Sequence, residues 1–268
     1  MVLTELKNHT AKKISPQEVL GDYKISFLSR TLSLIGRKEV LGGRAKFGIF
    51  GDGKELAQIA MAKVFNPGDW RSGYYRDQTL MLCLKLLTPK QFFSQLYADT
   101  CKEREPHSSG RQMNCHFSTP FVDNNGKWLN QMASANSASD LSPTAAQMTR
   151  LLGLAYASKY YRYLGRTNNK FGGTEKFSNQ GNEVAFGTIG NASTSEGLFW
   201  ETMNASGVLQ IPLLMSVWDD EYGISVPNEY QTTKQSISAV MRGFSPEKDS
   251  PGIKIITAKG NEYYSLIN

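Results

Sequence analysis

The chain of 268 residues is long enough for one large α/β domain or two small ones, and its 40% hydrophobic content allows a well-filled core. The formal net charge is +6, but the basic residues are scattered among acids, which argues against direct nucleic-acid binding. No apolar run approaches the roughly 20 residues of a membrane span, and three cysteines without a CxxC pair argue against a disulfide framework. We therefore expect a cytoplasmic protein that binds neither nucleic acid nor membrane.

The first half of the chain is predicted to be helical after a polar N-terminal segment at residues 1–24. Apolar residues recur at helical spacing from about Asp22 to a stop at Gly42-Gly43. Further helices are predicted over residues 54–65, 79–87 and 88–103, the last with Thr88 as its N-cap. Residues 104–141 lack a periodic pattern, and such long stretches inside a compact domain are usually functional or mobile.

The second half is predicted to contain a strand–helix–strand unit. A long helix over residues 142–165, with Ser142 as N-cap, precedes a buried strand at 182–189. A helix at 195–209 and an apolar strand at 211–217 follow. A third strand is predicted at 252–259, and residues 260–268 resemble the start of another helix without a polar ending, which indicates a truncated sequence.

The ends of the first two strands are the informative positions. In a right-handed parallel crossover, both strand C-termini lie on the same edge of the sheet, where α/β proteins bind ligands. Gly190 and Asn191 end the first strand, and Asp219 and Asp220 end the second. We therefore expect these residues to be close in space.

The turn GNASTSEG, residues 190–197, has the features of an anion site without a standard phosphate motif. Ser193 and Glu196 have the spacing of a capping box at a helix start, where free N–H groups favour an anion. An anion beside the Asp220 carboxylate requires a bridging cation, and Mg²⁺ accepts amide and carboxylate oxygens such as those of Asn191 and Asp220. The alternative is that Asn191 is only a turn residue and the acids form a solvated loop.

These segments resemble the thiamine-diphosphate motif of the decarboxylating component of 2-oxoacid dehydrogenase complexes, alpha-subunit type. The resemblance rests on GNASTSEG and WDDEYGISVP, preceded in the expected order by GKELAQIAMAKVFNPGDW, YYRDQ, GRQMNCHFS and SPTAAQ. It implies an α/β, three-layer thiamine-diphosphate-binding fold, with a mostly parallel sheet and helices on both faces. The domain would span residues 25–268 and be incomplete at its C-terminus.

The resemblance also implies an activity and partners. Members of this family use thiamine diphosphate and Mg²⁺ for oxidative decarboxylation of a 2-oxoacid, such as pyruvate or a branched-chain 2-oxoacid, and transfer the acyl unit to a lipoyl group. The implied partners are a beta-type subunit or fused beta-type domain that completes the active site, and a lipoyl acyltransferase in a larger oligomer. Alternatives are an acetoin dehydrogenase, a transketolase-like enzyme, or a non-catalytic assembly subunit that retains the fold.

Residue roles follow from the motif matches. The residues implied in cofactor binding are Tyr75, Arg76, Ser142, Thr144 (through its backbone), Ala192, Ser193, Trp218 and Tyr222. The implied Mg²⁺ ligands are Asn191, Asp220 and the carbonyl of Tyr222. Near the substrate approach lie Arg111, Gln112 and the candidate catalytic residue His116, which is equally compatible with a structural role. Trp218 either lines the cofactor cleft or only covers the sheet.

Two departures from the family pattern offset each other. Asn191 stands where the family usually has an acid, and Asp220 stands where it usually has an Asn. The site keeps one carboxylate and one amide, so the charge balance around a cation is preserved and we expect a working site. Lys54 and Glu55 are expected to begin a helix, and the preceding loop FGIFGDG is a candidate to border the substrate.

Overall fold

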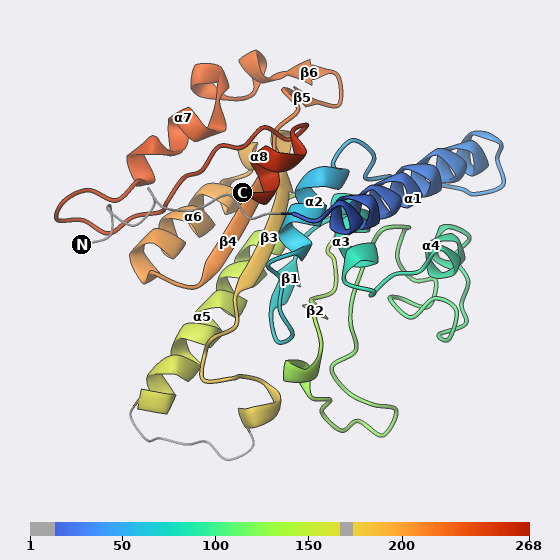
Figure 1. Cartoon of the computed structure of the whole chain (residues 1–268), viewed down its shortest axis with the longest axis horizontal. Helices are drawn as coiled ribbons and strands as arrows, with labels where there is room; N and C mark the ends of the chain where they lie inside the picture. Colours follow the sequence, from blue (N-terminus) through green and yellow to red (C-terminus); the bar gives the residue numbers. More distant parts are fainter. Residues whose placement is uncertain (1–13, 167–173) are drawn as a thin grey trace.

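A four-stranded parallel sheet lies at the centre of the computed structural model, which describes residues 14–166 and 174–268 (Figure 1). The strand order is β2-β1-β3-β4. The bounds of these strands are β1 Trp70–Ser72, β2 Asn136–Ser137, β3 Ala185–Gly190 and β4 Leu213–Trp218. A two-stranded antiparallel pair, β5 (Tyr222–Gly223) and β6 (Val226–Pro227), follows β4.

Helices account for most of the remaining regular structure. The α-helices are α1 Pro16–Leu41, α2 Glu55–Ala62, α3 Gln78–Cys83, α4 Pro89–Leu96, α5 Gln147–Arg166, α6 Gly197–Leu209, α7 Ile237–Met241 and α8 Tyr263–Ile267. The 3₁₀ turns are η2 Tyr75–Asp77, η3 Gln131–Ala133, η4 Thr174–Lys176, η5 Ala192–Ser195, η6 Asn228–Tyr230, η7 Thr233–Gln235 and η8 Arg242–Phe244. Within the described ranges, no helix is long and apolar enough to cross a membrane.

Strand β3 separates two helical layers, as the alternation of its side chains shows. Phe186 is buried with residues of α2 and α3, whereas Ile189 is buried with residues of α5 and α6. Figure 1 shows α6 and α2 on opposite sides of the sheet. Helix α5 packs directly on the strand backbone, because a Cβ at Gly187 would lie 2.2 Å from a Leu151 methyl carbon. The predicted α/β fold with a mostly parallel sheet and helices on both faces is confirmed.

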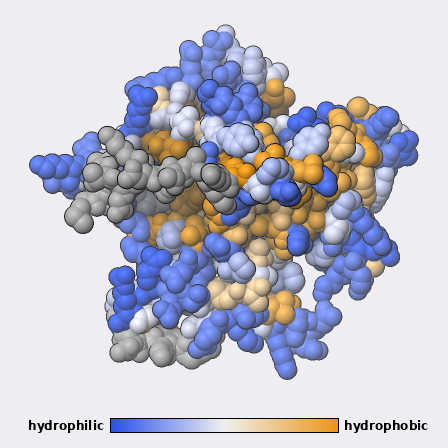
Figure 2. Space-filling view, in the orientation of Figure 1, coloured by the Kyte–Doolittle hydropathy of each residue, from blue (hydrophilic) through white to orange (hydrophobic). Residues whose placement is uncertain are grey.

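Helix α1 begins earlier than expected and turns much of its apolar surface outward. It starts at Pro16, inside the predicted polar segment, because the Ser15 hydroxyl accepts the Glu18 N–H and Pro16 fits the first position. Its buried face carries Leu32 between small residues, while Phe27 is 61% exposed. Figure 2 shows this apolar surface over α1 and neighbouring elements.

Helices α2 to α6 are all shorter than their sequence patterns predict, and α4 and α5 lose the most residues at one end. Helix α5 begins at Gln147 instead of Ser142, because Ala145 adopts a left-handed conformation with φ of 61° that a right-handed helix cannot include. Helix α4 has the expected Thr88 cap but ends at Leu96, just before Ala98 with φ of 54°. The SPTAAQ segment is therefore a turn that leads into α5.

The strand predictions were right for the crossover unit and wrong elsewhere. β3 and β4 pair in parallel over their whole lengths, as expected. Residues 252–259 form no strand; Ile253 and Ile255 instead pack their side chains against the cluster around α6. The sequence patterns also missed β1 and β2, which have only three and two residues and are too short to show a period.

Candidate functional site

The adjacent ends of β3 and β4 bring the predicted metal ligands to one edge of the sheet. Gly190 is paired with Trp218, and the Asn191 N–H donates to the Trp218 carbonyl at 3.2 Å. Asp219 and Asp220 follow directly, and Tyr222 begins β5 two residues later. The expected proximity of the two strand tips is confirmed, although they are separated in sequence by a whole helix.

Asn228 joins the two strand tips through its side chain. It accepts a hydrogen bond from Asn191 Nδ2 at 2.8 Å and donates to Asp219 Oδ1 at 3.0 Å. The same Asp219 oxygen accepts the Glu221 N–H at 2.9 Å. Asp219 therefore shapes the loop after β4. No sequence signal had singled out Asn228, which starts the short turn η6 after Pro227.

Asp220 takes no part in that bridge and points elsewhere. Its carboxylate accepts from the Lys54 ammonium at 2.8 Å, with the Asp220 side chain 47% exposed. Partial burial pulls its pKa upward, but Lys54 holds the pKa of Asp220 below its ordinary value. Within the described residues, no group of three or more His, Cys, Asp or Glu side chains could hold a metal ion. A cation here would therefore depend on amide and backbone oxygens besides Asp220.

Tyr74 contributes a buried hydroxyl that faces the tip of β3. A Cβ placed on Gly190 would lie 3.4 Å from the Tyr74 hydroxyl oxygen, and this oxygen is buried without a hydrogen-bond partner among the described residues. The ring packs against Trp218, with centroids 5.7 Å apart. Burial raises the pKa of Tyr74 well above its ordinary value, so the hydroxyl keeps its proton. An unsatisfied donor at this position fits a ligand with phosphate oxygens.

Replacing Tyr74 by Phe tests whether this hydroxyl is reserved for a ligand. Without ligand, we expect the free energy of unfolding of Tyr74→Phe, measured by thermal denaturation, to equal that of the parent chain or to be slightly higher. The reason is that removing a buried hydroxyl without a partner relieves a desolvation cost. A loss of more than about 1 kcal/mol would mean that the hydroxyl has a partner in the ligand-free protein. Tyr263→Phe, which removes a hydroxyl bonded to Asp22, serves as the contrasting variant.

The predicted diphosphate residues lie beside this hydroxyl, in η2. The Arg76 guanidinium carbon is 5.0 Å from the centre of the Tyr75 ring, and its Nη1 donates to the Phe50 carbonyl at 3.4 Å. The loop before α2 packs tightly on this turn, because a Cβ at Gly51 in that loop would lie 2.5 Å from the Arg76 carbonyl oxygen. The loop and η2 thus hold Arg76 near the strand tips.

His116 and Ser142 meet as a pair. His116 is buried, and its Nε2 lies 3.2 Å from the Ser142 hydroxyl oxygen. Its Nδ1 lies 3.3 Å from the Asn114 carbonyl, and Gln95 donates to the His116 carbonyl at 2.6 Å. Thr144 lies two residues after Ser142, in the exposed part of the turn before α5.

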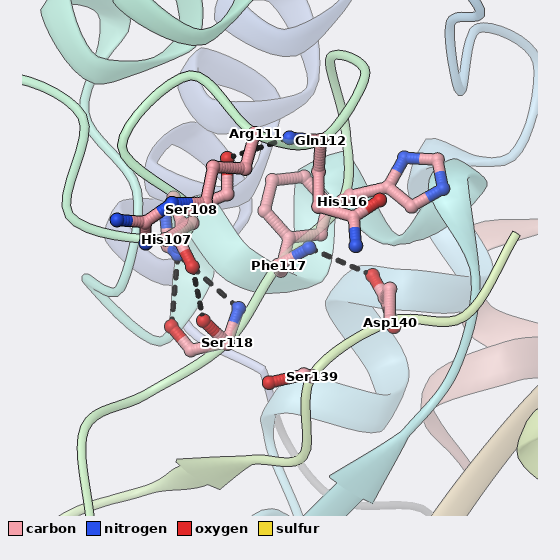
Figure 3. Close-up of a pocket in the computed structure, with 9 residues that line it drawn as sticks. All are labelled: His107, Ser108, Arg111, Gln112, His116, Phe117, Ser118, Ser139 and Asp140. Carbon is pink, nitrogen blue, oxygen red and sulfur yellow. Dashed lines mark hydrogen bonds between the residues drawn. The ribbon is translucent and has the colours of Figure 1, made fainter. Parts of the chain in front are cut away.

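Arg111, Gln112 and His116, which the motif assigns to the substrate approach, line one hollow of about 180 Å³ (Figure 3). Figure 3 shows His107 bonded to Ser118 at one end of the hollow, and at the other end His116 and the Asp140 carboxylate, which accepts the Phe117 N–H. The remaining lining residues are Ser108, Phe117 and Ser139. Most of its lining residues have polar side chains, and the hollow could hold a small anion-bearing molecule through Arg111.

The predicted capping box in GNASTSEG is wrong. Residues Ala192–Ser195 form a 3₁₀ turn, and α6 begins only at Gly197, with Glu196 as an N-cap that makes no side-chain cap bond. Ser193 instead uses its carbonyl, which accepts the Glu196 N–H at 3.2 Å. The turn still places Ala192 and Ser193 next to Asn191, so a ligand there would meet a 3₁₀ turn.

Comparison with known proteins identifies the family of this chain. A family model described as "Dehydrogenase E1 component" matches residues 23–254. The chain belongs to the dehydrogenase E1 component family. The predicted resemblance to the E1 component of a dehydrogenase complex is thereby confirmed.

The E1 chain is also similar to individual curated proteins. It is 27% identical over 259 residues to "2-oxoisovalerate dehydrogenase subunit alpha" of Bacillus subtilis. The aligned region covers 95% of this chain and 64% of that protein. It is 24% identical over 252 residues to the mitochondrial protein of the same description from Mus musculus, covering 94% of this chain and 47% of that protein. The chain thus spans between about half and two thirds of the length of these relatives.

Behind the site of this E1 component lies a buried ionic cluster that sequence analysis missed. Arg71, in β1, is fully buried and contacts two carboxylates, Asp77 Oδ2 at 2.5 Å and Asp140 Oδ1 at 2.9 Å. The Thr188 hydroxyl donates to Asp77 at 2.7 Å, and the Phe117 N–H donates to Asp140 at 2.9 Å. The cluster ties β1, η2, β3 and the loop around the hollow together.

The only sequence signal for this cluster was weak. Asp77 directly follows the YYR motif, but Arg71 lies in NPGDWRSG, which has the composition of a turn. Burial raises the pKa of Asp77 to about 6, and the Asp140 carboxylate adds to this effect while Arg71 opposes it. One guanidinium therefore holds two buried carboxylates close to the candidate site.

Proposed function

We propose that this E1 chain binds thiamine diphosphate with Mg²⁺ and takes part in the oxidative decarboxylation of a 2-oxoacid, with transfer of the acyl unit to a lipoyl group. The observation that carries the proposal is the parallel pairing of β3 and β4, which brings Asn191 to the same sheet edge as the loop that begins with Asp219 and Asp220. The unpaired Tyr74 hydroxyl at the same edge supports an oxygen-rich ligand. The relatives described as 2-oxoisovalerate dehydrogenases favour a branched-chain 2-oxoacid.

The proposed metal ligands have the chemistry that Mg²⁺ prefers. The Asn191 amide oxygen, the Asp220 carboxylate and the Tyr222 carbonyl are all hard oxygen donors, and phosphate oxygens and water complete such sites. Tyr75 and Arg76 would bind the diphosphate, since a guanidinium suits bidentate contact with phosphate oxygens. Ala192 and Ser193 would lie beside the phosphates, and Trp218 would support the site by packing on Tyr74.

The remaining residues act around the reacting end of the site. Thiamine diphosphate supplies the electron sink that allows CO₂ to leave a 2-oxoacid. Ser142 and the Thr144 backbone would orient the aminopyrimidine ring. His116 would hold or move a proton at its Nε2, which already meets the Ser142 hydroxyl. Arg111 and Gln112 would face the incoming substrate from the polar hollow.

The proposal includes partners. The relatives are described as alpha subunits, which supports a beta-type subunit or domain that completes the active site. A lipoyl acyltransferase would accept the acyl unit, and the assembly would be an oligomer in the cytoplasm. We expect the chain alone to bind the cofactor poorly and to lack full activity.

Isothermal calorimetry with thiamine diphosphate and Mg²⁺ tests this function in the protein assembled with a beta-type chain. We expect cofactor binding that depends on Mg²⁺, and turnover of 2-oxoisovalerate above that of pyruvate, 2-oxoglutarate or acetoin. Preferred turnover of acetoin would assign an acetoin dehydrogenase. Absence of cofactor binding in the assembled protein would exclude the enzyme function and leave a non-catalytic assembly subunit.

A further inference from the structure

Lys54 reaches the candidate metal site from a distant part of the chain. It directly precedes α2, and its side chain is only 14% exposed. Its neighbour Glu55 is buried and forms a two-point ion pair with Arg30 of α1, at 2.7 and 2.9 Å. Because Gly51 packs on the Arg76 carbonyl at the start of the same loop, Lys54 is held at both sides. Its ammonium is therefore directed toward the strand tips by the fold.

The Lys54 ammonium pairs with only one of the two acids that follow β4. Lys54 Nζ lies 2.8 Å from Asp220 Oδ2, although 166 positions separate the two residues. Asp219 is engaged instead with the Glu221 N–H and the Asn228 amide. The carboxylate that is the proposed Mg²⁺ ligand thus already pairs with a positive charge supplied by the chain.

We propose that the Lys54 ammonium is a tethered monovalent cation that competes with a divalent cation for Asp220 and is released toward the diphosphate when the metal–diphosphate pair binds. The part that concerns the diphosphate rests on the function proposed above. A divalent ion that approaches the ligand-free site must displace Lys54 and is repelled by it. A diphosphate offers the displaced ammonium an alternative anionic partner, so metal and diphosphate should bind together more readily than the metal alone.

Replacing Lys54 by Gln tests the competition directly, with Mn²⁺ alone as the probe. Mn²⁺ binding to the chain without diphosphate is measured by electron paramagnetic resonance. We expect Lys54→Gln to bind Mn²⁺ about three- to fivefold more tightly than the parent chain, because removal of the ion-pair partner frees the partly exposed carboxylate. Inorganic pyrophosphate binding at saturating Mn²⁺ should weaken in the same variant, because one cation for the diphosphate is lost.

Two further variants separate this effect from a general change in charge. Lys63→Gln removes another poorly exposed lysine of the same region, which pairs with Glu18 and Asp22 instead, and should leave Mn²⁺ affinity unchanged. In an Asp220→Asn background, Lys54→Gln should no longer tighten Mn²⁺ binding. The inference is overturned if Lys54→Gln binds Mn²⁺ no more tightly than the parent, including no detectable binding by either, or if the gain persists without Asp220.

The outcomes also separate this inference from the proposed function. If the assembled protein binds thiamine diphosphate while Lys54→Gln leaves Mn²⁺ affinity unchanged, the function stands and the Lys54 role is wrong. If Lys54→Gln tightens Mn²⁺ binding but the assembled protein binds no thiamine diphosphate, the competition at Asp220 stands, whereas the function and the release toward diphosphate are both wrong.

Discussion

Replacing Arg71 by Met is expected to lower the free energy of unfolding by about 3–5 kcal/mol, because it strands two buried carboxylates without their shared guanidinium. Asp77 and Asp140 both contact Arg71, and none of the three side chains is more than 1% exposed. Urea denaturation measures the loss. As a matched control, Arg44→Met breaks the pair with Glu39, in which Arg44 is 62% exposed, and should cost far less because solvent screens the pair.

The loss in Arg71→Met should depend on pH in a defined direction. Burial already raises the pKa of Asp77 to about 6 in the presence of Arg71, and without the guanidinium the folded-state pKa should rise further. A carboxyl whose pKa is raised by folding favours the folded state below its unfolded pKa of about 4, and this contribution is lost as pH rises through the folded value. The deficit should therefore be smaller at pH 5 than at pH 8; an equal deficit at both would contradict the assignment.

Replacing Asp220 by Ala is expected to weaken Mg²⁺-dependent binding of thiamine diphosphate by about 100-fold in the assembled protein. Loss of a residue that only supports a metal ligand already weakens metal binding by about 10- to 100-fold, and loss of the ligand itself should reach the upper end of that range. The reason is that Asp220 is the carboxylate among the three proposed Mg²⁺ ligands. Calorimetry at saturating Mg²⁺ measures the change, and Asp220→Asn, which keeps the shape and removes the charge, shows how much of it is electrostatic.

Asp219→Ala is the matched control for the metal assignment. Asp219 fixes the loop through Asn228 and the Glu221 N–H, so its removal should lower the free energy of unfolding by about 0.5–1.5 kcal/mol but reduce cofactor binding much less than Asp220→Ala does. If the two variants weakened cofactor binding equally, Asp220 would not be the metal-binding acid. A larger effect at Asp219 would assign the metal to the other carboxylate.

The sequence predicted the parts of the site that depend on local pattern. An apolar run, a turn and a helix identified β3, α6 and β4, and the rule for parallel crossovers placed the ends of β3 and β4, with Asn191 and the two acids, at one edge of the sheet. The family was also evident from short motifs in a fixed order. These features could be predicted because each depends on neighbouring residues or on a chirality that every parallel crossover shares.

The tertiary structure decided what each charged side chain contacts. Asp219 shapes the loop through its contact with Asn228, and Asp220 pairs with Lys54. The pairing with Lys54 joins residues far apart in the chain. The buried Arg71 cluster was hidden because β1 has three residues and its Arg resembles part of a turn. Which side chains pair depends on the distances between them in the packed protein, and local sequence periodicity does not predict those distances. The sequence by itself therefore determined where the strand tips meet, and the packed structure determined which charges meet there.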